Sequence, residues 1–280
     1  MTGRLVLVST PIGNLGDMSP RAVEALRSCA LICCEDTRHS GKLLSYTGVS
    51  GVRLAVANEH TEDARADEVL GLLAGGHDVA VVTDAGTPGI SDPGMRLVAA
   101  AIANGHPVSA VPGPAALVMA VVISGFDTGR FAFDGFLPRS GKERTERLAE
   151  VAAERRTTVL YEAPHRVQRT VADLAAVCGP ERRIALAREL TKLHEEVWRG
   201  TLAHAVERVN EVDPRGEYVL VLEGAPKDAP ATDNDIVTAL RMALRTGADR
   251  RTAIATVMTS TGAAKRRVYD LALSIPRAEP

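Results

Sequence analysis

The stretch Thr83-Asp-Ala-Gly-Thr-Pro-Gly-Ile-Ser-Asp-Pro-Gly94 decides the fold prediction for this chain. It lies between an apolar run at residues 78–83, which we expect to be a strand, and a helical pattern at residues 93–104. Its glycines allow the backbone to approach a ligand closely, and its prolines stiffen the loop. The stretch therefore predicts the carboxyl end of a strand in an open α/β sheet, which is where such sheets bind ligands.

Two carboxylates in this loop, Asp84 and Asp92, narrow the kind of ligand. Carboxylates suit a ligand with an amine or ribose hydroxyls better than a triphosphate, and no lysine follows the loop as it does in a P-loop. An ordinary turn, in which Ser91 or Asp92 is the N-cap of the next helix, is the structural alternative.

Two more loops end apolar runs in the same way. Residues 4–10 lead into Pro11-Ile-Gly-Asn14, and residues 108–111 lead into Pro112-Gly-Pro-Ala-Ala116. Because these strands and a further strand at 30–34 alternate with helices at 20–28, 63–74, 93–104 and 117–123, we expect a parallel, helix-covered sheet. Its three loops should then line one crevice at the carboxyl edge.

The second half of the chain repeats the α/β pattern after a weaker stretch at residues 125–144. We expect strands at 157–162, 183–188 and 217–223, and helices at 143–153, 167–178 and 201–209. A linker rich in Pro, Ala and Asp follows at 224–233, and a short helical tail follows the linker. The predicted division is residues 1–124, residues 125–224, and a linker with a helical tail at residues 225–280.

Charged residues gather after several predicted strands and form a candidate catalytic cluster. Its members are Glu35, Asp36, Arg38, Glu59, His60 and Lys192. The pKa of a histidine suits proton transfer near neutral pH, whereas Lys192 could act as a base only if desolvation lowered its pKa. Solvated ion pairs of small energetic value are the alternative interpretation of this cluster.

The composition sets limits on partners. The 280 residues carry a formal net charge of −2, so any affinity for nucleic acid must come from local patches. The tail offers one patch, because a short helix, Gly262 and the basic segment Lys265-Arg-Arg267 resemble a helix-turn-helix layout. Arg250 and Arg251 would add phosphate contacts, and a packing or dimerisation appendage is equally compatible with this pattern.

The four cysteines, Cys29, Cys33, Cys34 and Cys178, follow no leader peptide and form no CxxC motif. We therefore expect reduced, buried thiols and no metal site. No apolar run reaches the roughly 18 residues that a membrane span needs, so a cytoplasmic protein without a membrane partner is expected.

Several motifs together resemble one known family. Residues 9–17, 35–38, 58–60, 84–94, 111–114, 136–138, 161–166 and 187–192 resemble, in order, the ribosomal RNA small subunit methyltransferase I family of the tetrapyrrole-methylase superfamily. That resemblance implies a two-domain α/β tetrapyrrole-methylase fold with S-adenosylmethionine (SAM) in the cleft between the domains, plus the small helical domain. It also implies a homodimer and no metal.

The resemblance further implies a substrate and a set of SAM contacts. The substrate would be the ribose 2′-hydroxyl of a cytidine, expected at position 1402, in the 16S rRNA of the 30S ribosomal subunit. The SAM contacts would be Pro11, Ile12, Asp84, Gly86, Thr87, Ala115, Ala116, Tyr161, Glu162 and Leu190. A tetrapyrrole C-methyltransferase and a non-catalytic ribosome-assembly factor are the alternative functions.

Overall fold

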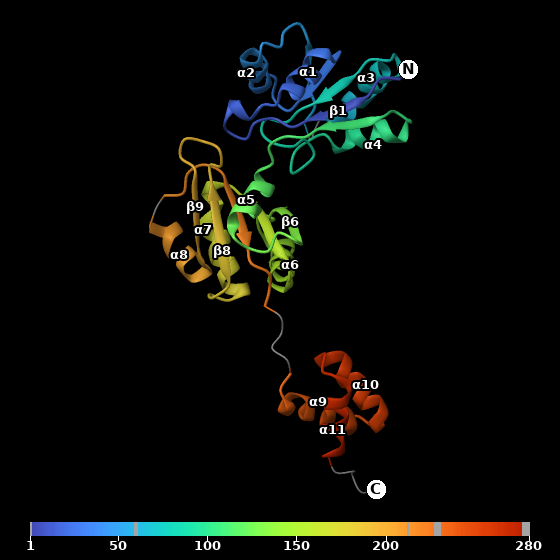
Figure 1. Cartoon of the computed structure of the whole chain (residues 1–280), viewed down its shortest axis with the longest axis vertical. Helices are drawn as coiled ribbons and strands as arrows, with labels where there is room; N and C mark the ends of the chain where they lie inside the picture. Colours follow the sequence, from blue (N-terminus) through green and yellow to red (C-terminus); the bar gives the residue numbers. More distant parts are fainter. Residues whose placement is uncertain (1, 59–60, 212, 227–230, 276–280) are drawn as a thin grey trace. The chain divides into compact units, whose positions relative to one another are not determined.

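The computed structural model describes residues 2–58, 61–211, 213–226 and 231–275. The chain forms two compact units, Met1–Ala225 and Pro226–Pro280. The first unit contains two five-stranded sheets with helices packed on them, as Figure 1 shows, and the described part of the second unit is helical. The predicted α/β fold with a C-terminal helical region is therefore confirmed.

The first sheet is parallel throughout, with the strand order β3-β2-β4-β1-β5. Its strands are β1 (Leu5–Val8), β2 (Leu31–Cys34), β3 (Arg53–Val56), β4 (Val79–Val81) and β5 (Val108–Val111). All five carboxyl ends consequently lie at one edge, as the sequence predicted for this half of the chain.

Helices cover both faces of the first sheet. They are α1 (Pro20–Ser28) and α2 (Thr37–Thr47) on one face, and α3 (Glu62–Ala74) and α4 (Met95–Ala103) on the other, with a 3-10 turn, η1 (Leu15–Asp17), before α1. Cys34 packs on the α1 side and Cys33 on the α3 side, because neighbouring residues of a strand face opposite ways. Burial raises the pKa of Cys33 to about 12, so this thiol is an apolar core residue.

The second sheet is mixed, with the strand order β6-β7-β10-β8-β9. Its strands are β6 (Phe131–Phe136), β7 (Thr157–Glu162), β8 (Arg183–Arg188), β9 (Glu196–Thr201) and β10 (Tyr218–Leu222). Among neighbouring strands of this sheet, β6 and β7 form the one parallel pair. Strand β10 pairs antiparallel with both β7 and β8. The start of β10 therefore lies at the same edge as the ends of β7 and β8.

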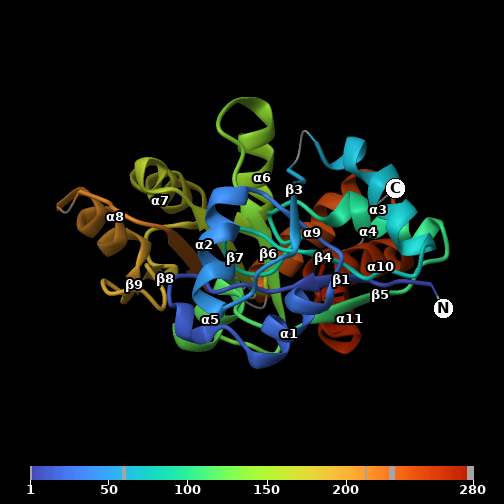
Figure 2. The ribbon, with the colours of Figure 1, turned by 90° about the horizontal axis from the view of Figure 1, so that it is seen from above.

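The two faces of the second sheet are covered by different parts of the chain. One face packs against α6 (Gly141–Ala153), α7 (Pro164–Cys178) and α8 (Leu202–Glu211), and Figure 2 shows α7 beside α8. The other face packs against α5 (Ala116–Ser124), which follows β5 directly. The chain thus passes from the first sheet to the second at residues 112–115. The predicted division at residues 124 and 125 stays a prediction.

The second unit contains α9 (Asp233–Arg245), α10 (Arg250–Thr261) and α11 (Lys265–Leu273). A capping box between Thr232 and Asp235 starts α9, and Gly262, with φ of 64°, ends α10. Apolar residues from all three helices form one core. No helix in the described ranges is long and apolar enough to cross a bilayer.

The elements that were missed from the sequence are the short η1, α2, β3, β6 and β9. The helix α2 has the sequence TRHSGKLLSYT, in which Thr, His, Ser and Gly are weak helix formers. It forms because Asp36 caps its start, Gly48 ends it in the left-handed region, and Leu43 and Leu44 are buried. The edge strand β9 is only half-buried, so it lacks the apolar alternation that identifies a strand.

Candidate functional site

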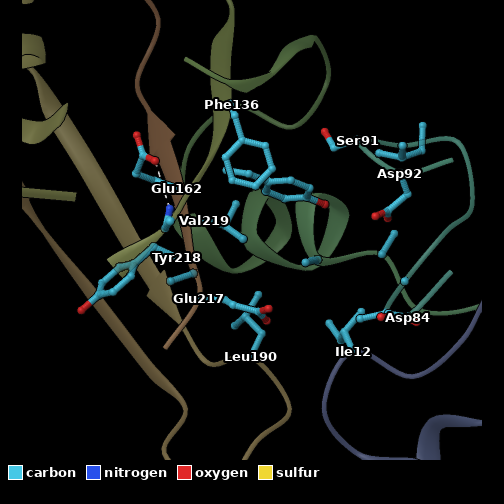
Figure 3. A pocket seen from close by; sticks show the side chains of 18 of the residues that line it. Ile12, Asp84, Ser91, Asp92, Phe136, Glu162, Leu190, Glu217, Tyr218 and Val219 are labelled. Atoms are coloured by element: carbon cyan, nitrogen blue, oxygen red, sulfur yellow. Dashed lines mark hydrogen bonds between the residues drawn. The ribbon is translucent and has the colours of Figure 1, made fainter. Parts of the chain in front are cut away.

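A cavity of about 530 Å³ lies between the two sheets of the first unit. Loops after β1, β4 and β5 line one side, and the end of β7, the loop after β8 and the start of β10 line the other, as Figure 3 shows. A cavity of this size, with apolar walls and a few polar groups, is typical of small-molecule sites.

The three loops of the first sheet are joined by hydrogen bonds. The backbone N–H of Thr10 donates to Gly86 O over 2.8 Å, and Gly86 N–H donates back to Thr10 O over 3.1 Å. Gly86 has φ of 93°, a conformation that other residues rarely adopt. The Thr87 hydroxyl donates to Pro114 O over 3.1 Å and lies 3.2 Å from the Ser9 hydroxyl. The predicted crevice therefore exists as one connected structure.

Asp84 presents a buried carboxylate oxygen to this crevice. Its Oδ1 atom is buried and has no hydrogen-bond partner within the protein. A buried acceptor without a donor costs free energy, about 1–3 kcal/mol in typical cases, unless a ligand or water supplies the donor. Asp84 therefore fits a ligand that brings a hydroxyl or amine group, and SAM carries both.

The opposite wall is apolar and aromatic. Leu190 and Val219 contribute aliphatic groups, and Tyr161 and Phe136 contribute rings. The two rings meet edge to face with centroids 5.7 Å apart. An adenine-sized plane can lie on such a wall. With Asp84 opposite, the residues present fit a nucleoside ligand such as SAM.

Glu162 lines the cavity, but its oxygens are held by the protein. Its Oε2 accepts from the Thr170 hydroxyl over 2.6 Å, and its Oε1 accepts from the Ala163 N–H over 3.0 Å. The Arg166 guanidinium lies 3.2 Å from Oε1. These contacts fix the end of β7 to the start of α7, so Glu162 shapes the cavity wall.

Lys192 joins the loop after β8 to the start of β10. Its Nζ lies 2.8 Å from Glu189 Oε1 and 2.8 Å from Glu217 Oε2. Burial lowers the pKa of Lys192, but the hydrogen bonds that its ammonium group donates to Glu189 and Glu217 outweigh this effect, so the net pKa is raised. Lys192 could act as a base only if its pKa were lowered. Because its pKa is raised instead, the amine stays protonated near neutral pH.

Asp36 and Arg38 lie at the start of α2 and do not line the cavity. Asp36 Oδ1 accepts the Arg38 backbone N–H over 2.8 Å, which is an N-cap bond, and Arg38 Nη2 lies 2.6 Å from Asp36 Oδ2. The hydrogen bond from the Arg38 side chain lowers the pKa of Asp36 to about 2. Asp36 thus acts on its own helix in this structure.

Asp92 belongs to the loop at residues 83–94, but it was not predicted as a site residue from the sequence. It lines the cavity, and Figure 3 shows its side chain directed into it. Burial, followed by repulsion from Glu35, raises the pKa of Asp92 to about 6. A carboxyl group that titrates this close to neutral pH can exchange a proton during a reaction.

The structure brings most of the predicted site residues together. Those that line the cavity are Ile12, Glu35, Asp84, Gly86, Thr87, Ala115, Ala116, Tyr161, Glu162, Leu190 and Lys192. Pro11 is buried beside Ile12 without lining the cavity, and Glu59 and His60 lie outside the described residues. The roles of all these residues stay predictions.

Other residues line the cavity but were not chosen as site residues from the sequence, mainly at β10 and in the loop before α4. They include Ser91, Asp92, Phe136, Glu217, Tyr218 and Val219. The β10 residues were missed because the site was sought only at carboxyl ends of strands, and β10 reaches this edge with its amino end.

No metal site accompanies the cavity in the part of the chain that the structure describes, where no group of three or more His, Cys, Asp or Glu could hold an ion.

Comparison with known proteins identifies the family. Residues 4–206 match the family described as Tetrapyrrole (Corrin/Porphyrin) Methylases. A protein of Synechocystis sp. named ribosomal RNA small subunit methyltransferase I is 44% identical over 275 residues, which is 98% of each chain. The chain belongs to the ribosomal RNA small subunit methyltransferase I family. A member of this family from Micromonospora olivasterospora is 41% identical and covers 100% of this chain and 90% of its own.

Solved structures share the fold of this methyltransferase family member. The methyltransferase CobJ superposes with a TM-score of 0.60 at 21% identity, covering 82% of this chain and 98% of its own. A uroporphyrin-III C-methyltransferase of Thermus thermophilus, solved with S-adenosylhomocysteine, gives a TM-score of 0.56 at 15% identity and covers 79% of this chain and 97% of its own.

Proposed function

We propose that this protein transfers the methyl group of SAM to the ribose 2′-hydroxyl of a cytidine in 16S rRNA, at position 1402, within the small ribosomal subunit. Relatives named ribosomal RNA small subunit methyltransferase I support an rRNA substrate. A substrate on the ribosome also supports a cytoplasmic location.

One observation favours RNA over a tetrapyrrole as the methyl acceptor. The tetrapyrrole-methylase match ends at residue 206, and the solved tetrapyrrole enzymes cover about four fifths of this chain but nearly all of their own. The rRNA methyltransferase of Synechocystis covers 98% of both chains, so it extends through the helical second unit. The second unit is thus shared with this rRNA methyltransferase and lies outside the part of the chain that matches the tetrapyrrole enzymes.

The chain's own residues can bind SAM and place it for the reaction. SAM supplies an activated methyl group on a sulfonium, whose positive charge disappears on transfer. We propose that Asp84 accepts a hydrogen bond from the bound nucleoside, while Tyr161, Leu190 and Ile12 hold the apolar part of the ligand. The adjoining carboxylates Glu35 and Asp92 favour a cationic ligand in this cavity.

Methylation assays test the function directly. Labelled SAM is incubated with the protein and either naked 16S rRNA or assembled 30S subunits from a strain that lacks this methylation. We expect label on a ribose 2′-oxygen of one cytidine. Label on a tetrapyrrole precursor would support the alternative enzyme, and an absence of transfer to any acceptor would support a non-catalytic assembly factor.

The SAM site has its own test. Asp84→Ala should weaken SAM binding by about 10-fold or more, because a hydrogen bond to a charged group contributes about 1.5–3 kcal/mol. Calorimetric titration measures this affinity. Asp17→Ala, an exposed carboxylate of η1 that does not line the cavity, is the matched control. Equal affinities of the two variants would remove Asp84 from the site.

We propose that the second unit holds RNA. Arg251, Lys265 and Arg266 are exposed, whereas Arg267 bonds Asp233 and Arg250 donates to the Ile275 carbonyl. Three exposed cations can contact phosphates. Tyr269 is 50% exposed one turn after Lys265 and can stack on an unpaired base.

Truncation after Ala225 tests this role, since the first unit is compact on its own. The truncated protein should keep its SAM affinity and lose RNA affinity in a salt-dependent way. Neutralising Arg251, Lys265 and Arg266 together should lower the salt slope by about 1 for each phosphate that the protein no longer binds. Unchanged affinity and slope in both variants would make the second unit a packing appendage.

A homodimer, which the resemblance implies, is part of the proposal. On α5, Val118, Met119 and Val122 are 40%, 43% and 60% exposed, an apolar surface that a second copy could cover. Sedimentation of Val122→Asp against wild type measures whether this face contributes.

A further inference from the structure

The amino end of α4 is capped by a residue distant in sequence. Glu62 Oε1 accepts the Gly94 N–H over 3.1 Å and the Leu97 N–H over 2.9 Å. Glu62 is 3% exposed, and the N-cap residue Gly94 has no side chain with which to cap the helix. Ser91 and Asp92 therefore do not cap α4, which was the alternative interpretation of this loop from the sequence. The position of Asp92 needs another explanation.

The backbone before Asp92 adopts an unusual conformation. Ser91 has φ of 60°, which is uncommon for a residue other than glycine. Hydrogen bonds hold this turn, because Gly89 N–H donates to Pro93 O over 3.0 Å and Ile90 N–H donates to Thr87 O over 3.2 Å. Strain of this kind persists only where the surroundings enforce it, and it often serves a functional site. Here it directs Asp92 into the cavity (Figure 3).

The groups that face Asp92 come from every element around the cavity. Glu35 follows β2, Asp84 follows β4, and Glu217 precedes β10, and all three repel a negative charge on Asp92. The Thr83 side chain acts in the opposite direction, because it favours the ionised form of Asp92. The other titratable residues that line the cavity are Tyr161, Glu162, His165, Lys192 and Tyr218. Burial and the negative charge of Asp92 raise the pKa of Tyr161, which keeps that phenol protonated.

We propose that Asp92 is the base that accepts the proton of the ribose 2′-hydroxyl during methyl transfer, an inference that rests on the proposed function. The hydroxyl oxygen forms a bond to the methyl carbon while the carbon–sulfur bond breaks and its electron pair moves to sulfur. The hydroxyl proton passes to the Asp92 carboxylate. The products are the 2′-O-methyl ribose, S-adenosylhomocysteine and a protonated Asp92, which later releases its proton to solvent.

Three other charged residues, Lys192, Glu162 and Asp36, fit this role less well. Lys192 remains protonated between Glu189 and Glu217, and the Glu162 oxygens are engaged by Thr170, Ala163 and Arg166. Asp36 is paired with Arg38 away from the cavity. The pKa of Asp92, about 6, leaves most of this group ionised at neutral pH while keeping it basic enough to take a proton.

Single-turnover methylation of the 30S substrate at saturating SAM, measured from pH 5 to pH 8.5, tests the proposal. Because the base must be ionised, the wild-type rate should fall as pH drops below about 6. Asp92→Asn should lose about 100-fold or more in rate, the usual scale for a proton-transfer group, and should lose this acid limb. The SAM affinity of Asp92→Asn, measured by calorimetry, should remain high enough for the SAM concentration of the assay to saturate this variant.

Two further variants make the outcome specific. Asp63→Asn changes an exposed carboxylate on α3 that pairs with Arg96, and it should keep the wild-type rate and profile. Glu35→Gln changes the neighbouring carboxylate to which Thr83 donates over 3.4 Å, and it should keep the acid limb while shifting it to lower pH.

Three results would overturn the role of Asp92: a wild-type rate in Asp92→Asn, an acid limb that survives in that variant, or an acid limb lost only in Glu35→Gln. A wild-type protein that transfers no methyl group to RNA would instead overturn the proposed function, so the two failures can be told apart.

Discussion

Asp36 and Asp92 both lie just before a helix of the first sheet, but their environments differ. Asp36 caps α2 and pairs with Arg38, and its pKa is lowered to about 2. Asp92 leaves the capping of α4 to Glu62 and faces the cavity, and its pKa is raised to about 6. The difference shows that a carboxylate near the start of a helix is available for chemistry when another residue accepts the hydrogen bonds of the first helical N–H groups.

The strongest way to break this comparison is to remove the cap of α4. Glu62→Ala leaves the N–H groups of Gly94 and Leu97 without their buried acceptor, which should cost about 1–3 kcal/mol in the free energy of unfolding. Methylation should fall as well, because the freed helix start can attract Asp92 out of the cavity. Urea unfolding and single-turnover assays measure the two effects.

Glu62→Gln is the matched control for that loss, since its amide oxygen can still accept both N–H groups. It should recover most of the stability and the activity. If Glu62→Ala were as stable and active as wild type, Glu62 would not be what frees Asp92.

A smaller effect is expected on the stability of the Asp92→Asn variant. The pKa of Asp92 is raised from 3.8 to about 6, so ionising this group costs more in the folded protein than in the unfolded chain. The wild-type protein therefore loses stability as pH rises from about 4 to about 6, and Asp92→Asn avoids that loss. We expect the variant to be more stable by about 1–2 kcal/mol at pH 7.

Unfolding at pH 4 and at pH 7 checks this sign. The advantage of Asp92→Asn should be full at pH 7 and much smaller at pH 4, where Asp92 is largely protonated in the folded wild type and about half ionised in the unfolded chain. A variant that is less stable than wild type at pH 7 would show that the charge of Asp92 is stabilised in the fold.

The smallest effects belong to Asp36. Asp36→Asn should change stability little, because asparagine caps a helix as well as aspartate does, whereas Asp36→Ala should lower the melting temperature slightly. Since the pKa of Asp36 is about 2, its contribution should be constant above pH 4 and should fade only as pH falls toward 2. Thermal melts across this pH range measure the effect, and a change near pH 6 would contradict this pairing.

Much of the fold followed from local patterns. The loop at residues 83–94 and the two similar Gly/Pro loops predicted the parallel first sheet, because each ends a buried apolar strand. The prediction was less complete where tertiary contacts decide. Strand β9 is half-buried, and α2 contains weak helix formers, so neither carries a strong periodic signal.

The candidate site shows the same limit. The loops that line the cavity could be found from the sequence, because glycine and proline mark them. The choice between Asp36 and Asp92 could not, since it depends on Glu62, which lies 32 residues before Gly94 and reaches it only in the folded protein. Likewise, Glu217 and Val219 reach the cavity because β10 runs antiparallel to its neighbours.

Gly13, in the loop after β1, lies against the side chain of Lys192, in the loop after β8. A Cβ atom at position 13 would lie 2.2 Å from Lys192 Cγ, so the lysine stem occupies the space that any larger residue would need. The loop after β1 and the loop after β8 are thus fitted to each other by one missing side chain. Among related chains, we expect residues at these two positions to covary, with a larger residue at position 13 accompanied by a shorter one at position 192.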